Sequence, residues 1–166
     1  MVRHKMKKPR HIAFDWGDTL MPDDPTKKEP MFLWPTLTVF PDAQEVLPYL
    51  AARVTLSLAT NAEHSDEEMI KRALARVGID RYFDQIFCFR RVGKKKADPG
   101  FWQFLLSSLI TNADDVWMVG DSFEGDVVPS SRAGIYSVWL NRRTPEHRTG
   151  DSFRTVHDLN ELRVLL

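Results

Sequence analysis

The sequence lacks several features, and each shortage excludes a class of protein. Its 166 residues include one cysteine, Cys88, so no disulfide can form within the chain, and its apolar neighbours indicate a buried structural thiol. Lysine plus arginine and aspartate plus glutamate balance at 23 each, so no overall field attracts nucleic acid or an anionic membrane. No apolar run reaches the length of a membrane span, and the basic residues 1–10 lack the apolar stretch of a signal peptide. We therefore expect one cytoplasmic domain over residues 1–166, with residues 1–10 as a basic lead-in.

Apolar segments of strand type alternate with segments of helical spacing. Strands are expected over residues 12–14, 54–59, 82–89, 116–119 and 135–140, with an extended piece near 154–156. Helices are expected over residues 41–53, 66–77, 99–110, within 123–133 and from 158. Ser65 and Glu68 form a capping-box pattern at the start of the second helix. This alternation predicts the α/β class, as a doubly wound, Rossmann-like, mainly parallel sheet with helices on both faces.

Residues 21–41 form a proline-rich segment. Five prolines fall in these residues and disfavour a regular helix. Several large apolar side chains lie between the prolines and need cover from solvent. We expect a folded-back loop that packs on the domain and also acts as a flap at the entrance to the site.

Polar groups follow the predicted strands at the points where those strands end. Asp15 ends the first strand, Thr60 the second, and Asp121 the fourth, while Lys96 follows the third. The carboxyl ends of strands in a doubly wound sheet lie on one edge, where such folds bind ligands. Carboxylates gathered there repel one another without a cation, and Mg²⁺ suits one or two carboxylates plus a substrate phosphate. The sequence therefore predicts a magnesium and phosphate site at this edge.

Taken singly, each of these residues has a simpler interpretation. Aspartate and glycine favour turns for backbone reasons, and Thr60 could be an ordinary hydroxyl at a strand end. Lys96 is the last of three consecutive lysines, a pattern typical of a solvated turn. Asp126 lies near the start of a predicted helix, where the helix dipole favours an acid.

Four segments, taken together, resemble the haloacid dehalogenase (HAD) superfamily, whose commonest members are Mg²⁺-dependent phosphatases. They read Phe-Asp-Trp-Gly-Asp-Thr-Leu at residues 14–20, Leu-Ala-Thr-Asn at 58–61, Lys-Ala-Asp-Pro at 96–99 and Val-Gly-Asp-Ser-Phe-Glu-Gly-Asp at 119–126. The motifs occur in the order of the superfamily and extend over almost the whole chain. The resemblance implies an enzyme, a hydrolase of phosphoric monoesters that acts on a phosphorylated small molecule.

The resemblance also implies a role for each motif residue. Asp15 would be the nucleophile that accepts the phosphoryl group. Magnesium would be bound by Asp15, the backbone carbonyl of Gly17 and the Asp121 carboxylate.

The remaining motif residues would bind phosphate. Thr60 and the backbone of Asn61 would hold phosphate oxygens, and Lys96 would neutralise charge in the transition state. Asp126 would orient Lys96 or a metal-bound water.

The chain departs from the superfamily pattern at Gly17. Phosphatases of the superfamily carry there a second aspartate that protonates the leaving group and then activates water. Here the next aspartate is Asp18, and neighbouring side chains in an extended segment point to opposite sides. Asp18 is a candidate acid/base. Without such a group, the enzyme should prefer substrates with good leaving groups.

The spacing of the motifs leaves no room for a cap domain. About 40 residues separate Thr19 from Thr60, most of them in the proline-rich segment and one helix. An open site suits a bulky substrate or closure by a partner subunit in a homo-oligomer. Trp16, Trp34 and His64 could contact substrate, but packing for Trp34 and a place at the helix entry for His64 are the favoured interpretations, which leaves Trp16 as the candidate contact. The alternative from another class is a non-catalytic phosphate-binding domain on the same scaffold. The basic residues 90–96 leave nucleic-acid processing open as a third hypothesis, which the zero net charge disfavours.

Overall fold

A single parallel sheet organises the chain. The computed structural model describes residues 6–166, so the first half of the predicted basic lead-in lies outside the described residues. The strands are β1 (His11–Phe14), β2 (Thr55–Ala59), β3 (Phe83–Phe87), β4 (Val116–Gly120), β5 (Tyr136–Leu140) and β6 (Phe153–Val156). They lie in the order β3-β2-β1-β4-β5-β6, and every neighbouring pair is parallel. The predicted doubly wound α/β fold is confirmed.

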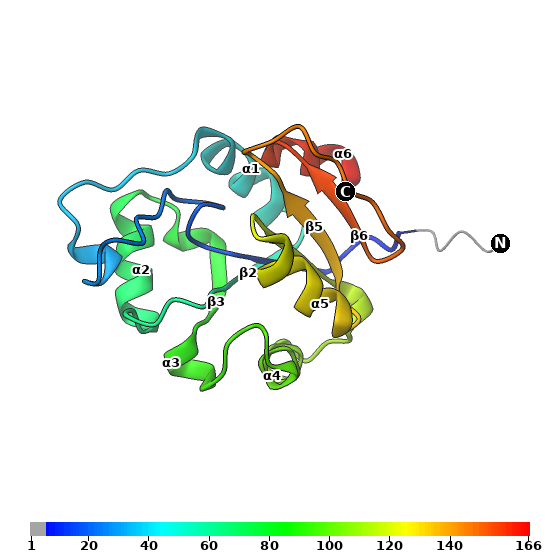
Figure 1. Ribbon diagram of the computed structural model, residues 1–166, viewed down its shortest axis with the longest axis horizontal. Coiled ribbons are helices and arrows are strands. Elements are labelled where there is room, and N and C mark those ends of the chain that lie inside the picture. The colour runs from blue at the N-terminus through cyan, green and yellow to red at the C-terminus, as the bar shows by residue number, and fades with distance from the viewer. Residues whose placement is uncertain (1–5) are drawn as a thin grey trace.

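Helices cover both faces of this sheet. They are α1 (Pro41–Ala51), α2 (Glu67–Arg76), α3 (Phe89–Val92), α4 (Pro99–Leu109), α5 (Val128–Arg132) and α6 (Leu162–Leu165), and a π-helical turn (Phe123–Val127) precedes α5. Figure 1 shows α1 and α6 together on one side of the sheet and α4 on the other. Among residues 6–166, none of the helices combines the length and apolar character needed to cross a bilayer.

Two apolar clusters, one on each face, hold the layers together. Along β1, Ile12 and Phe14 belong to the cluster under α1 and α2, whereas Ala13 belongs to the cluster under α4. The change of side at every residue is the two-residue period of a strand buried on both faces. Phe101 and Trp102 of α4 fill the second cluster and are almost fully buried.

Two local predictions were wrong. The cap of α2 is Asp66, whose side chain accepts a hydrogen bond from the Met69 N–H at 2.9 Å, and Ser65 makes no such bond. The extended backbone of Asp66 places its carboxylate at the free amides of the first turn, which a cap one residue earlier cannot reach. The third strand ends at Phe87, because Phe89 already begins the short helix α3. Cys88 lies between these elements and is fully buried.

The proline-rich segment packs back on the domain, mainly against α2. Its residues Met31–Leu33 form a single 3₁₀ turn. The guanidinium of Arg76, on α2, donates to the backbone carbonyls of Phe32, Trp34 and Pro35 at 2.6–3.2 Å. One side chain thus satisfies three carbonyls of a segment whose prolines prevent a regular hydrogen-bond ladder.

Candidate active site

The site lies where the strand order of the sheet reverses. From β1 the chain proceeds outward to β2 and β3, and from β4 it proceeds the other way to β5 and β6. Doubly wound sheets bind ligands at this switch point, outside the carboxyl ends of the strands. Asp15 follows β1, and its N–H donates to the carbonyl of Val119 in β4 at 2.9 Å. Asp121 directly follows β4, so the two carboxylates leave adjacent strand ends.

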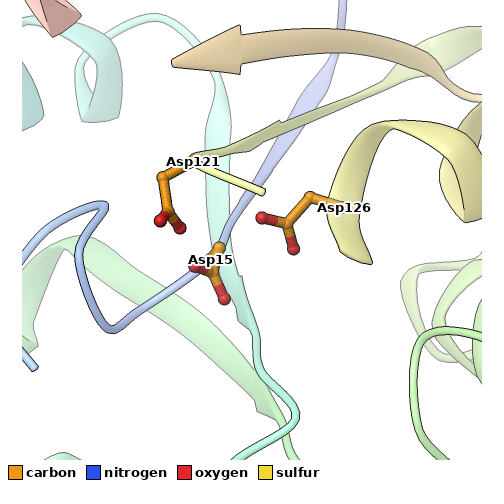
Figure 2. A group of neighbouring side chains, drawn as sticks. All are labelled: Asp15, Asp121 and Asp126. Carbon is orange, nitrogen blue, oxygen red and sulfur yellow. The ribbon is translucent and has the colours of Figure 1, made fainter. Parts of the chain in front are cut away.

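Three carboxylates converge at this point. Asp15, Asp121 and Asp126 each offer an oxygen within 4.8 Å of the others (Figure 2). Asp126 returns to the strand end because the chain makes the π-helical turn after Ser122, whose N–H donates to Asp126 Oδ2 at 3.0 Å. Gly120 leaves the space for that carboxylate, since a Cβ atom on residue 120 would clash with Asp126 Oδ2. The position of the Asp126 carboxylate therefore requires a glycine at residue 120.

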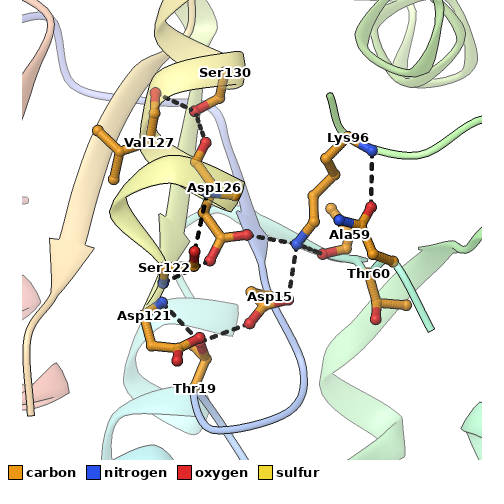
Figure 3. Close-up of polar contacts among 12 residues, drawn as sticks. Asp15, Thr19, Ala59, Thr60, Lys96, Asp121, Ser122, Asp126, Val127 and Ser130 are labelled. Atoms are coloured by element: carbon orange, nitrogen blue, oxygen red, sulfur yellow. Dashed lines mark hydrogen bonds and ion pairs between the residues drawn. The ribbon is translucent and has the colours of Figure 1, made fainter. Parts of the chain in front are cut away.

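The ammonium group of Lys96 joins two of these carboxylates. It donates to Asp15 Oδ1 at 2.8 Å, to Asp126 Oδ1 at 2.5 Å and to the carbonyl of Ala59 at 3.0 Å (Figure 3). Three acceptors satisfy its three N–H groups, and the side chain is only 2% exposed. The solvated-turn interpretation of Lys96 is therefore wrong.

Two side chains hold the backbone of Lys96 in this inward position. The Asn61 side-chain oxygen accepts the Lys96 N–H at 2.8 Å, and the Trp102 indole donates to the Lys96 carbonyl at 2.8 Å. These bonds explain why the third lysine of the run turns inward. Lys95, by contrast, is half-exposed and pairs with Glu63.

Thr19 links the other pair of carboxylates. Its hydroxyl lies 3.0 Å from Asp15 Oδ2 and 3.1 Å from Asp121 Oδ1, and it accepts the Asp121 N–H at 3.1 Å. One hydroxyl hydrogen can serve only one of the two carboxylates at a time. Thr19 thus bridges the two acids but donates a hydrogen bond to only one of them at a time.

Burial and mutual repulsion shift the ionisation of the cluster. Burial and the charge of Asp15 raise the pKa of Asp121 to about 7. Burial and Asp15 also raise the pKa of Asp126 to about 6, against the opposing pull of Lys96. Burial by itself would lower the pKa of Lys96, but the carboxylates of Asp126 and Asp15 outweigh it and hold that pKa above its usual range. One ammonium shared between two acids leaves the third acid without a cation.

The donor set fits a divalent cation. Three carboxylates and one ammonium leave a net formal charge of −2. Lys96 and the Ser122 N–H engage the two oxygens of Asp126, and Lys96 and Thr19 engage those of Asp15. Asp121 contacts Thr19 through Oδ1 alone, so among the described residues it is the acid of the cluster with an oxygen left open. Hard carboxylate oxygens in this number suit Mg²⁺, which keeps further positions for water or phosphate.

A cavity of about 420 Å³ opens over Asp15, Asp126 and Lys96, whereas Asp121 lines a neighbouring cavity. Thr60 also lines the first cavity, together with the candidate substrate contact Trp16 and with Trp34. Its wall also includes His64, and the proline-rich segment forms one side. The Thr60 hydroxyl accepts the Ala62 N–H at 3.1 Å, which orients it at the end of β2.

Some predicted residues do not join this arrangement. Asp18 has a left-handed backbone, with φ of 61°, and its carboxylate lies 3.4 Å from Arg143 at a neighbouring cavity. Arg90 and Arg91 donate to backbone carbonyls of Glu63 and Ile86, which accounts for their direction without an anion.

Two residues of the site were missed from the sequence. Thr19 stands four residues after Asp15 within the first motif, so the spacing was a usable signal. Asp23 lies in the proline-rich segment, and its carboxylate lines the same cavity as Asp15. Desolvation raises the pKa of Asp23, and the charges of Asp18 and Asp15 add to the effect. No sequence pattern singles out Asp23.

Known proteins are similar to this chain in sequence and in fold. The chain is 30% identical over 132 residues to the pyrimidine 5′-nucleotidase YjjG of Escherichia coli, covering 78% of this chain and 57% of the relative. It is 27% identical over 126 residues to the phosphoserine phosphatase of Thermus thermophilus, covering 75% and 49%. The chain thus spans about half the length of these curated relatives.

A solved structure matches nearly end to end. An uncharacterized protein of Listeria monocytogenes superposes with a TM-score of 0.81 at 28% identity, covering 93% of this chain and 97% of the other. Residues 6–166 form one α/β domain in which no cap domain is evident. The family model of the haloacid dehalogenase-like hydrolases matches residues 26–140. The chain therefore belongs to the haloacid dehalogenase-like hydrolase family.

Proposed function

We propose that this hydrolase is a Mg²⁺-dependent phosphatase that acts on a phosphorylated small molecule through a phosphorylated Asp15. The observation that carries the proposal is the buried contact of Lys96 with Asp15 and Asp126 at the cavity, with Asp121 at the end of the adjacent strand β4. A carboxylate nucleophile, a cation and a charge deficit of one divalent ion are the components that phosphoryl transfer needs.

Binding of the phosphate group would use two side chains and one backbone N–H from residues that line the cavity. The Thr60 hydroxyl and the backbone N–H of Asn61 would hold phosphate oxygens, next to the Lys96 ammonium. Lys96 is buried beside Asp15, so water would screen its attraction for a phosphoryl group there only weakly. Asp126 holds Lys96 through a 2.5 Å bond and is a positioning residue.

The reaction divides into two displacements at phosphorus. An Asp15 carboxylate oxygen attacks, the bond from phosphorus to the leaving oxygen breaks, and an acyl phosphate forms on Asp15. Water then attacks the same phosphorus, the Asp15–phosphate bond breaks, and inorganic phosphate leaves. Asp15 returns as a carboxylate, so one difficult hydrolysis becomes two easier steps.

Magnesium would be held by Asp15, Asp121 and the backbone carbonyl of Gly17. When bound, it supplies positive charge that offsets the phosphate oxygens and lowers repulsion between substrate and carboxylates. Burial and the charge of Asp15 raise the pKa of Asp121, and a cation bound between the two carboxylates would offset that repulsion.

The names of the relatives support phosphate esters as substrates. A nucleotidase and a phosphoserine phosphatase both act on phosphorylated small molecules. Trp16 and Trp34 line the cavity and are only 3% and 7% exposed, so they would give it a small apolar edge beside the phosphate. The proline-rich segment would act as the flap over the cavity, and a partner subunit could complete the open side.

Phosphate release tests the proposal. We would assay aryl, acyl, sugar and nucleotide phosphates with Mg²⁺ or with chelator, using the wild type and Asp15→Asn. Asp114→Asn is a matched control, because Asp114 is an exposed acid before β4, away from the cavity. The expected result is metal-dependent release that is retained by Asp114→Asn and lost by Asp15→Asn.

Acid quenching of the wild type during turnover should trap phosphate on Asp15. If no substrate gives release above Asp15→Asn, the phosphatase proposal is wrong. Binding of inorganic phosphate to such an inactive protein would then favour the non-catalytic phosphate-binding domain.

A further inference from the structure

The family position for the acid/base aspartate is Gly17, and the space beside Gly17 is filled. A Cβ atom on residue 17 would lie 2.9 Å from Cβ of Asp23 and 3.1 Å from Asp23 Oδ2. Contacts below 3.0 Å require one partner to move. The Asp23 carboxyl, from the proline-rich segment, therefore enters the space that a side chain on residue 17 would use.

Three features hold the Asp23 carboxyl in this place. The backbone N–H of Asp23 donates to Asp18 Oδ1 at 3.0 Å, and Asp23 Oδ1 accepts the N–H of Asp24 at 2.8 Å. Pro22 and Pro25 on either side restrict the backbone. Asp18 is itself turned away from the Asp15 cavity by its left-handed backbone, which lets its carboxylate hold the Asp23 backbone.

The second oxygen of Asp23 remains available. Among residues 6–166, no donor bonds to Oδ2, and Asp23, Gly17 and Asp15 line one cavity. The residue is exposed to solvent, so water can reach it. A carboxyl with one fixed and one open oxygen, beside the nucleophile, has the geometry of a proton donor and acceptor.

We propose that Asp23 is the general acid and base of this enzyme, in place of the aspartate that Gly17 lacks. The inference rests on the proposed phosphatase function. In the first displacement, Asp23 gives its proton to the leaving oxygen as that oxygen separates from phosphorus, so the product leaves as a neutral alcohol. In the second, the Asp23 carboxylate takes a proton from the water that attacks phosphorus, and Asp23 is protonated again.

An acid at Asp23 would widen the range of substrates beyond the one expected from Gly17 alone. A chain without an acid should accept only good leaving groups, whereas Asp23 would let the wild type hydrolyse alkyl phosphates as well. Asp23→Asn is a clean test, because an asparagine oxygen still accepts the Asp24 N–H and only the ionisable group is lost. Asp24→Asn is the matched control, since it removes a charge from the same turn while its oxygen still accepts the N–H of Thr26.

The experiment compares kcat/KM for an alkyl phosphate and for 2,4-dinitrophenyl phosphate in wild type, Asp23→Asn and Asp24→Asn. Asp23→Asn should lose about 10²–10⁴-fold on the alkyl ester and under about tenfold on the dinitrophenyl ester. It should also show a burst of dinitrophenol, as phosphorylated Asp15 accumulates without a base to activate water. Asp24→Asn should match the wild type on both.

Equal effects of Asp23→Asn on both substrates, or none on either, would overturn the role of Asp23 while leaving the phosphatase intact. A wild type that releases no more phosphate than Asp15→Asn would instead overturn the proposed function, and this inference with it.

Discussion

Replacement of Lys96 by methionine isolates the energetic role of the buried ammonium. Methionine fills a similar apolar volume but provides none of the three N–H donors. Asp15 and Asp126 would lose the cation that stands 2.8 Å and 2.5 Å from their oxygens. Removal of one partner from a buried ion pair typically costs about 3–5 kcal/mol, because the remaining charge stays desolvated.

That cost is large relative to a total stability of about 5–15 kcal/mol. In urea, with an m-value of about 2 kcal/mol/M, it corresponds to a denaturation midpoint lower by roughly 1.5–2.5 M at pH 8 with chelator present. The matched control is Lys95→Met, which removes a half-exposed charge paired with Glu63 and should cost under about 1 kcal/mol.

The stability difference between wild type and Lys96→Met should depend on pH, with a sign that follows from the pKa of Asp126. The pKa of Asp126 is raised to about 6, so its contribution to stability is greatest below about pH 4 and is lost as pH rises through 6. Without Lys96 the pKa of Asp126 should rise further. The variant should therefore go on losing stability at pH values above 6, where the wild type no longer does. The stability gap between wild type and Lys96→Met should therefore widen from pH 5 to pH 8. A gap that stays constant, narrows, or equals that of Lys95→Met would refute this account of the charge cluster.

Three further predictions concern other contacts of the site. Gly120→Ala should destabilise the protein by about 1–3 kcal/mol in thermal denaturation, because its methyl group would displace the fixed carboxylate of Asp126; an unchanged Tm would contradict the steric link. Magnesium affinity, measured by calorimetry, should tighten as pH rises through about 7, because Asp121 must release its proton to bind; affinity independent of pH from 6 to 8 would exclude this coupling. Arg76→Met should speed hydrogen exchange in residues 31–35 with little change in global stability, since three carbonyls there lose their donor; unchanged exchange would show that packing alone holds the segment.

Much of the fold could be predicted because its signals are local. The strand before Asp15 has a continuous apolar run, and α2 and α4 have helical spacing with Gly78 and Pro99 at their ends. Such patterns depend on residues close together in the chain. The cap of α2 was misassigned because Ser65 and Asp66 both suit that role, and only the backbone angles choose between them.

The residues of the site also fall into those that local sequence patterns predict and those that they do not. Asp15, Lys96 and Asp121 stand in motifs, so the sequence alone placed them at one edge of the sheet. The position of Asp23 depends on how the proline-rich segment folds back over Gly17, a contact between chain segments that no periodic pattern records. Asp18 was the nearer candidate in the sequence, yet its positive φ turns its carboxylate toward Arg143.

The burial of Cys88 gives the native chain a practical property. Its thiol is fully shielded, and desolvation raises its pKa, so thiol reagents should not modify the folded protein. A cysteine introduced into an exposed part of the proline-rich segment, such as position 28, could then carry the sole label without removal of the natural one. Fluorescence from that label would report movement of the segment over the cavity during turnover. Slow modification of Cys88 itself would report opening of the core.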